Sequence, residues 1–297
     1  MQRAQAPKPG RNQLWDCPQR HSETPPRGRG FRRTIMELET LLFSEADGVA
    51  EITLNRPNAR NAVNLDLAKE LKSVAELCAA SDSIRAVLLT GAGPVFCAGG
   101  DLMHFAAAGD KLTEALDEMM SFYHPALEAL ANMDAPVIAA INGPVAGAGV
   151  GLVASCSMAI ASDASSFTLA YGMAGLNPDG STTFHLPRLI GMRRAEEMML
   201  TNRTLTAQDA LDWGLISQVA AETEVLEKAR TTAARLANGP TAAFGRTRRL
   251  LLASASNTLE DQLELERQNV LASTQTHDFK EGAQAFVERR PANFLGK

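Results

Sequence analysis

The chain has 297 residues, of which 45% are hydrophobic and 21% charged, a composition typical of a globular protein with a large buried core. Its net charge of −5 provides no general attraction to nucleic acid or to an anionic membrane surface. No apolar run reaches the roughly 18 residues that a membrane-spanning helix needs. We therefore expect neither a nucleic acid nor a membrane as partner.

The cysteines give no sign of a metal site or of disulfide pairing. Cys17, Cys78, Cys97 and Cys156 form no CxxC pair and have no metal-ligand spacing with the five histidines. They predict free thiols in a reducing compartment, and no metal. Cys97 lies in a glycine-rich loop, but a nucleophilic role is disfavoured because no plausible histidine partner lies nearby in the sequence.

Residues 1–35 differ from the rest of the chain. They contain eight basic and two acidic residues, five prolines and no hydrophobic periodicity, so the remaining residues carry a net charge of −11. We expect this segment to be disordered, or to be a non-native start upstream of Met36. We expect a cytoplasmic protein; the alternative is the mitochondrial matrix, if residues 1–35 are a transit segment.

Strands and helices alternate from residue 49 to residue 220. Alternating apolar residues predict a strand at Val49–Asn55, and Asn64 is a candidate N-cap for the helix that follows. Thr206 and Asp209 have capping-box spacing and predict the start of a later helix. Further strands are predicted at residues 86–90, 137–141, 158–162, 167–170 and 215–220, and a long amphipathic helix at residues 112–133.

From residue 221 onward the pattern is helical. Helices are predicted at about residues 224–237, 241–253, 258–274 and 278–289, separated by Asn238-Gly239-Pro240 and by polar breaks. The chain is thus expected to form an α/β core over residues 36–220, followed by a helical C-terminal subdomain over residues 221–297.

Two glycine-rich turns each follow a predicted buried strand. Residues 135–151 read APVIAAINGPVAGAGVG, and residues 91–102 read GAGPVFCAGGDL. Such turns allow backbone N–H groups to approach a ligand anion. Close packing of main chain against main chain is an alternative explanation for either turn alone.

Taken together, five segments make the chain resemble the crotonase superfamily of enoyl-CoA hydratases and isomerases, from Met36 to the C-terminus. In chain order they are ITLNRPNARNAVN, VLLTGAGPVFCAGGDL, PVIAAINGPVAGAGVGL, NPDGSTTFHLPRLIG and LTAQDALDWGLISQV. The resemblance implies a crotonase-like fold of stacked ββα units with two roughly perpendicular sheets. It also implies an acyl-CoA thioester substrate, a homotrimer or dimer of trimers, and no cofactor besides the coenzyme A of the substrate.

The resemblance assigns an oxyanion hole to the backbone N–H groups of Gly100 and Ala148, which would hold the thioester oxygen. It assigns further substrate contacts to Ala98, Gly99, Asp101, Leu102, Gly147, Gly151, Tyr171 and Phe286. Asp101 is expected to cap the following helix or brace its loop. Phe286 is expected to border the nucleotide site of a neighbouring subunit.

Hydratases that the chain resembles carry two glutamates, at positions held here by Gly151 and Tyr171. Neither residue can act as a carboxylate base, so hydration by that route is disfavoured. Asp179, in Asn-Pro-Asp-Gly, stands where isomerases of the family carry one acidic residue. We expect Asp179 to remove a proton from C2 of the acyl group and return it at C4. The alternative is that Asp179 merely stabilises a β-turn.

The sequence therefore predicts an enzyme that isomerises 3-enoyl-CoA to 2-enoyl-CoA, or performs a related ring isomerisation. The alternatives are an enoyl-CoA hydratase with a non-standard acid/base and a catalytically inactive CoA-binding member. Tyr171 is expected to line the acyl pocket or to orient Asp179. His104 and His124 are expected at the surface or lining the pocket, without a catalytic role.

Basic residues follow Gly245 in the sequence GRTRRLL. Arg246, Arg248 and Arg249 are candidates for contact with the phosphates of coenzyme A. Alternatively they form a solvated helix face.

Overall fold

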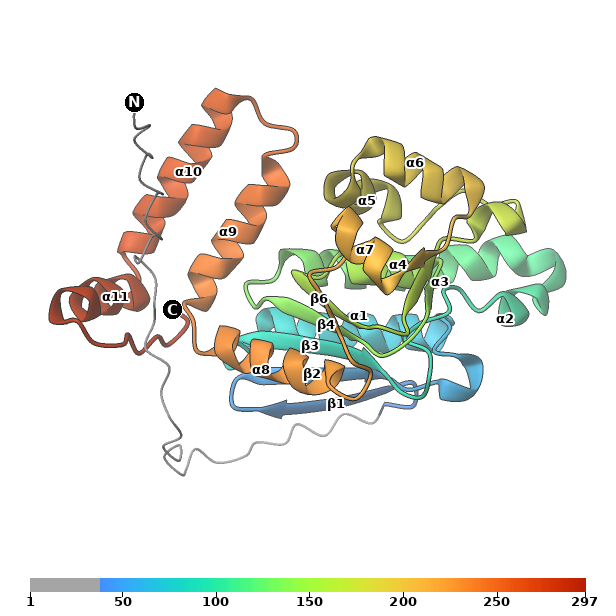
Figure 1. Ribbon diagram of the computed structural model, residues 1–297, viewed down its shortest axis with the longest axis horizontal. Helices are drawn as coiled ribbons and strands as arrows, with labels where there is room; N and C mark the ends of the chain where they lie inside the picture. The colour runs from blue at the N-terminus through green and yellow to red at the C-terminus, as the bar shows by residue number, and fades with distance from the viewer. Residues whose placement is uncertain (1–37) are drawn as a thin grey trace, which may run out of the picture. The chain divides into compact units, whose positions relative to one another are not determined.

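The computed structural model describes residues 38–297, so the predictions for residues 1–35 fall outside the described residues. The described chain forms two β-sheets, and helices cover both faces of the larger sheet (Figure 1). The predicted α/β class is confirmed. None of the helices in this range is long and apolar enough to cross a membrane.

The larger sheet has six strands in the order β1-β2-β3-β4-β6-β9. β1 and β2 pair antiparallel, and every other neighbouring pair is parallel. The smaller sheet has the order β5-β7-β8. The strands are β1 (Leu41–Ala46), β2 (Val49–Leu54), β3 (Ala86–Gly91), β4 (Val137–Ile141), β5 (Val145–Ala146), β6 (Met158–Ser162), β7 (Ser166–Thr168), β8 (Leu205–Thr206) and β9 (Gln218–Ala220).

Each predicted helix of the described residues is present to within a few residues. The helices of the core are α1 (Leu65–Ala80), α2 (Leu102–Ala106), α3 (Leu112–Asn132), α4 (Ala148–Ala154), α5 (Thr182–Ile190), α6 (Met192–Thr201) and α7 (Ala207–Trp213), of which α5 and α6 were not predicted. The predicted caps are present: Asn64 caps α1, and Thr206 and Asp209 form the capping box of α7. The later helices are α8 (Val225–Ala237), α9 (Thr241–Ala253), α10 (Leu259–Thr274) and α11 (His277–Glu288).

Both faces of the larger sheet are buried. Leu88 of β3 packs with Ala229 and Ala233 of α8 on one face. Val87 and Leu89, which point the opposite way because side chains alternate along a strand, belong to the core shared with α1 and α3. This burial on both sides explains why β3 and β4 are continuous apolar runs.

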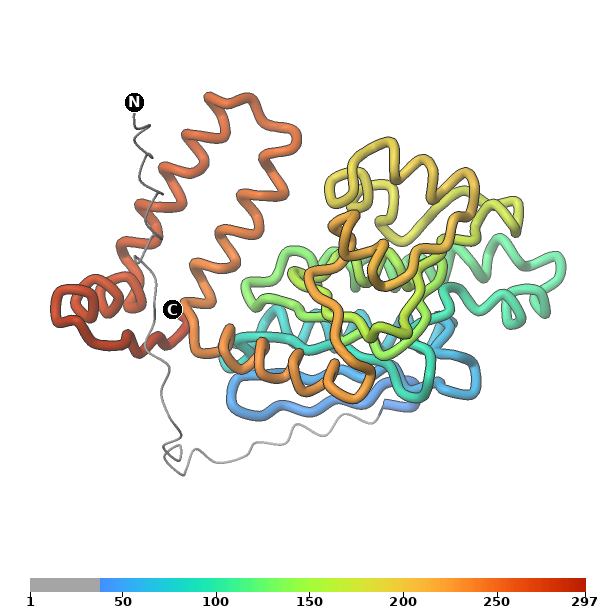
Figure 2. Tube along the Cα trace, viewed as in Figure 1, coloured from blue at the N-terminus to red at the C-terminus, as the bar shows by residue number. Residues whose placement is uncertain are grey.

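The helices of the predicted C-terminal region pack in two different ways. α8 covers the sheet, whereas α9 and α10 form an antiparallel hairpin that continues into α11 (Figures 1 and 2). None of the sixteen residues of α10 is buried in the described chain.

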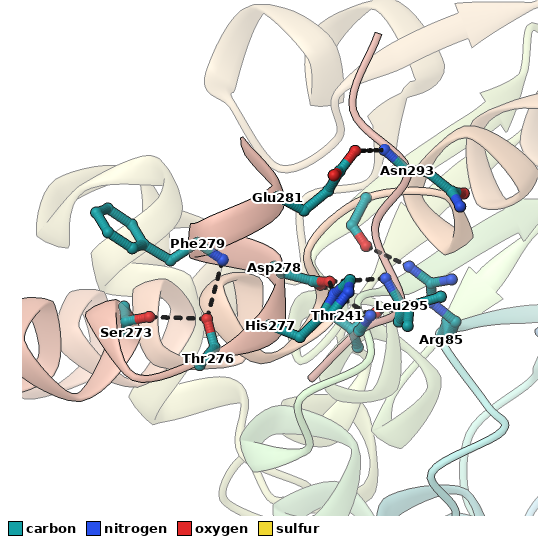
Figure 3. Close-up of polar contacts among 12 residues, drawn as sticks. Arg85, Thr241, Ser273, Thr276, His277, Asp278, Phe279, Glu281, Asn293 and Leu295 are labelled. Atoms are coloured by element: carbon teal, nitrogen blue, oxygen red, sulfur yellow. Dashed lines mark hydrogen bonds and ion pairs between the residues drawn. The ribbon is translucent and has the colours of Figure 1, made fainter. Parts of the chain in front are cut away.

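The end of the chain is hydrogen-bonded to α11 and lies beside the start of α9 (Figure 3). The Asp278 carboxylate, 4% exposed, accepts hydrogen bonds from the amides of Leu295 (2.7 Å) and Gly296 (2.8 Å). Arg85 donates to Thr241 Oγ1 (3.3 Å) and to Gly239 O (2.6 Å), beside the same tail. The two hydrogen bonds from the amides of Leu295 and Gly296 offset the free-energy cost of burying the Asp278 carboxylate.

α9 is attached to the end of α3 by Arg248. Its guanidinium donates to the carbonyls of Leu130 (2.8 Å), Met133 (2.6 Å) and Ala135 (2.9 Å). Leu130 lies in the last turn of α3, and Met133 and Ala135 follow the helix. Arg249 instead pairs with exposed Asp134. These two arginines are therefore engaged with the protein itself.

Replacing Arg248 with Met should lower the free energy of unfolding by about 2–3 kcal/mol, because three carbonyls lose their donor. Chemical denaturation followed by circular dichroism measures this loss. Arg249→Met is the matched control and should cost less than about 1 kcal/mol, because its ion pair is exposed to solvent. Equal losses in the two variants would contradict a clamping role for Arg248.

Candidate active site

Two loops follow the carboxyl ends of β3 and β4 and run side by side. A parallel bridge pairs Cys97 with Val145, and the Ala146 amide donates to Cys97 O (2.8 Å). Gly100 and Ala148 each lie three residues beyond the bridged residues. Within residues 38–297, no group accepts a hydrogen bond from the amide of either. Both amides are thus free to bind a ligand oxygen.

Glycines allow these loops to touch. Gly99 has φ 90° and Gly147 has φ 50°, a region that side-chain-bearing residues rarely adopt. A Cβ atom at Gly99 would lie 2.9 Å from Ala146 O and 3.2 Å from Gly147 Cα. The glycine-rich sequence therefore serves both close packing and the exposure of the two amides.

Two asparagines hold the first loop in place. Asn61 donates to the carbonyls of Ala92 (2.9 Å) and Val95 (2.7 Å). Asn142, at the end of β4, donates to Gly93 O (2.7 Å) and accepts from the Gly91 amide (3.2 Å). These bonds connect the loop to the segments that follow β2 and β4, and they thereby fix its main-chain conformation.

Asp101 caps α2, as predicted: its Oδ1 accepts from the His104 amide (3.1 Å). Its Oδ2 pairs with Arg56 at 3.0 Å, and both side chains are mostly buried. The carboxylate is thus committed to bracing the loop that contains Gly100. Leu102, the first residue of α2, is 58% exposed.

Gly151 is buried against the loop that carries Asp179. A Cβ atom at Gly151 would lie 1.7 Å from Gly180 O, so no side chain fits in this conformation. At the position where hydratases are expected to carry a glutamate, main chain of the Asp179 loop fills the space. Gly151 consequently packs on this loop and does not face an open cavity.

Asp179 is held through both its main chain and its side chain. Its carbonyl accepts from Thr182 Oγ1 (2.8 Å) and from the Tyr171 hydroxyl (3.3 Å). Burial, and then the neighbouring Asp179 charge, raise the pKa of Tyr171, so its hydroxyl remains a donor. The Oδ1 atom of Asp179 lies 2.8 Å from His124 Nε2. The Tyr171 hydroxyl thus contacts the main chain of Asp179 and not its carboxylate.

α3 contacts both parts of the site through adjacent residues. Tyr123, fully buried, donates its hydroxyl hydrogen bond to Ala148 O (3.0 Å), and burial raises its pKa well above the usual value. A Cβ atom at Gly180 would lie 3.3 Å from the Tyr123 ring and 3.5 Å from Ala148 Cα, so Tyr123, Gly180 and Ala148 pack together. His124, the next residue, contacts Asp179. Sequence reasoning missed Tyr123, which belongs to no motif; it expected His124 at the surface or lining the pocket, and His124 does line the cavity described below, but its contact with Asp179 was not predicted.

A cavity of about 420 Å³ opens at Asp179. Its walls come from α3, α5, the Asp179 loop and α9. Ionisable or polar side chains on the wall are His124, Glu128, Asn132, Asp179, Ser181 and His185, and the apolar ones include Leu127, Phe184 and Leu252. Burial, and then nearby Arg188, lower the pKa of His185, which favours its neutral form.

Other predicted residues lie apart from this cavity. Phe286 is 86% exposed on α11 and is not among the cavity walls. Cys97 is buried and Cys156 is partly buried, and burial raises their pKa values to about 11 and about 12. These thiols are poor nucleophiles at neutral pH. In the described part of the chain, no group of three or more His, Cys, Asp or Glu side chains is placed to hold a metal ion.

Comparison with known proteins gives consistent matches over nearly the whole described chain. The family described as enoyl-CoA hydratase/isomerase matches residues 44–297. A protein of Rhodobacter capsulatus named "probable enoyl-CoA hydratase" is 39% identical over 262 residues, covering 88% of this chain and all of that protein. The 1,2-epoxyphenylacetyl-CoA isomerase of Escherichia coli is 36% identical, again over 88% of this chain and all of the relative.

Two further comparisons extend this range. A 4-chlorobenzoyl coenzyme A dehalogenase of an Arthrobacter species is 36% identical, covering 79% of this chain and 86% of that protein. The crystal structure of an enoyl-CoA hydratase from Bacillus anthracis superposes with a TM-score of 0.82 at 32% identity, covering 87% of this chain and all of that structure.

Gly151→Ala should destabilise the protein by about 3 kcal/mol, because the added methyl group overlaps the carbonyl of Gly180. Thermal and chemical unfolding measure the loss. Gly282→Ala in α11 is the control, because there the methyl group meets only the movable ring of Phe294 at 3.3 Å. A Gly151→Ala protein as stable as wild type would show that the Asp179 loop can move away from α4.

Proposed function

Because the chain belongs to the enoyl-CoA hydratase/isomerase family, whose enzymes act on acyl-CoA thioesters, we propose that it isomerises an unsaturated or ring-containing acyl-CoA with Asp179 as its only acid/base. The observation that supports this most is the packing at Gly151. Main chain fills the position of a hydratase glutamate, and it belongs to the loop that presents Asp179 to the cavity. Hydration needs a base for water and a further proton donor, whereas a double-bond shift needs one carboxylate.

In the proposed reaction the thioester oxygen accepts hydrogen bonds from the amides of Gly100 and Ala148. Asp179 removes a proton from C2: the C–H bond breaks, its electron pair enters the enolate, and an O–H bond forms on the carboxylate. The same proton then returns at C4 as the double bond moves to C2–C3. Each oxyanion donor is worth about 10²–10³ in rate, and a placed carboxylate about 10²–10⁴.

The reaction as proposed consumes no other reactant, so the only cofactor involved is the coenzyme A that is part of the substrate. Ala98, Gly99, Leu102 and Gly147 would lie beside the thioester. The bacterial relatives support a cytoplasmic location.

Asp179→Asn should lower kcat for 3-enoyl-CoA by about 10²–10⁴-fold, because an amide cannot accept the C2 proton. Conversion to the 2-enoyl thioester is followed by its ultraviolet absorbance. Asp212→Asn, at an exposed position on α7, is the control and should leave the rate unchanged. Undiminished turnover by Asp179→Asn would refute the mechanism.

Assays with other thioesters distinguish the alternative functions. Rapid hydration of 2-enoyl-CoA would identify a hydratase. Turnover of 1,2-epoxyphenylacetyl-CoA would identify a ring isomerase, and chloride release from 4-chlorobenzoyl-CoA would assign Asp179 to a different reaction. Binding of these thioesters without turnover of any would indicate an inactive CoA-binding member.

We also propose that the chain assembles as a homotrimer or a dimer of trimers. Support comes from α10, which exposes Leu259 (76%), Leu263 (55%) and Val270 (62%). Sedimentation equilibrium should give three or six times the mass of one chain, and Leu263→Glu should weaken the assembly. A stable monomer at micromolar concentration would contradict this.

A further inference from the structure

The Asp179 carboxylate has one polar partner among residues 38–297. That partner is Nε2 of His124, 2.8 Å from Oδ1. The Asp179 main chain is fixed separately, through the hydrogen bonds that its carbonyl accepts from Tyr171 and Thr182. Once the main chain is fixed, the side-chain torsions alone decide where the two carboxylate oxygens point. In the described structure His124 is the contact that fixes them.

His124 is itself presented by a well-anchored element. α3 has 21 residues, and the neighbouring Tyr123 is fully buried and hydrogen-bonded to Ala148 O. The same helical turn therefore contacts the residue that supplies one oxyanion amide and the residue that supplies the carboxylate. These two contacts fix the distance between Ala148 and Asp179, although Tyr123 and His124 belong to none of the five sequence motifs.

We infer that His124 is a positioning residue for Asp179, an inference that rests on the proposed function. The imidazole donates its Nε2–H to Oδ1, which leaves Oδ2 to take the proton from C2 and to return it at C4. Oδ1 can accept this hydrogen bond whether Oδ2 is ionised or protonated, so the carboxylate keeps its direction through both transfers. The proton stays on Asp179 between the two steps and does not pass to His124.

Other ionisable side chains share the cavity. Glu128 comes from α3 and His185 from α5. Neither is hydrogen-bonded to His124 or Asp179 in the residues that the structure describes. The positioning contact is therefore specific to one imidazole.

Two substitutions at one position test this role. His124→Ala removes the donor, whereas in His124→Gln the side-chain amide can still donate to Oδ1 but cannot act as an imidazole base. His124→Ala should lower kcat about 10- to 100-fold with KM nearly unchanged, because a displaced carboxylate impairs the transition state more than substrate binding. His124→Gln should recover most of the lost rate.

His277→Ala is the matched control. His277 is 50% exposed and lies 3.3 Å from Asp278, a histidine–aspartate contact on α11 outside the cavity, whereas His124 is 48% exposed. This variant should retain the wild-type kcat. Unfolding midpoints of all three variants show whether any loss of rate follows from loss of fold.

Two kinetic outcomes would overturn the inference. His124→Ala with the wild-type kcat would show that Asp179 needs no positioning. His124→Gln as slow as His124→Ala would show that the imidazole acts through its protonation. Crystal structures of both variants should show the Asp179 carboxylate turned away in His124→Ala and retained in His124→Gln. If wild type turns over no thioester, the proposed function fails, and these crystal structures still decide whether His124 holds the carboxylate.

Discussion

Main chain packs directly on main chain at three places around the candidate site, and the rest of the site depends on these contacts. Gly99 lies against Ala146, Gly149 against Cys97, and Gly151 against Gly180. At each place an added Cβ atom would come closer than 3.0 Å to a neighbouring atom. Protein interiors do not absorb such overlaps without displacement of backbone. The positions of the two free amides and of the Asp179 loop are therefore mutually determined.

The larger sheet provides the support for this packing. Its parallel strands are buried on both faces, and the loops that carry Gly100 and Ala148 both leave it at carboxyl ends of adjacent strands. Thr90 and Asn142 join the ends of β3 and β4 by hydrogen bonds to Ala140 O and to the first loop. Ligand sites in parallel sheets commonly form at this edge, because loops from neighbouring strands meet there.

At Gly151, packing restricts which side chains the candidate site can hold. The absence of a side chain at this position is what allows the Asp179 loop to pack there, because a Cβ atom and the Gly180 carbonyl cannot occupy one space. Asp179 of this loop lines the cavity. The direction of the Asp179 carboxylate depends on α3, whose Tyr123 and His124 contact Ala148 and Asp179 respectively.

Local sequence determined much of this protein. Buried strands, capped helices and the two glycine-rich turns can be predicted because the residues that indicate each of them are close together in the sequence. The motifs likewise marked Gly100, Ala148 and Asp179, and family resemblance supplied the fold. Strands β1, β5 and β8 went unpredicted: β1 pairs with the adjacent β2, whereas β5 and β8 have two residues each and are defined by pairing with the more distant β7.

Only the tertiary structure decided which side chains meet Asp179. His124 precedes it by 55 residues, and on its own helix it is one polar residue of an amphipathic surface. Whether it faces solvent or the cavity depends on the rotation of α3 against the sheet, which the burial of Tyr123, Leu127 and Leu130 sets. The fit of Gly151 to Gly180 is of the same kind, because a glycine in the sequence does not reveal what occupies the space beside it.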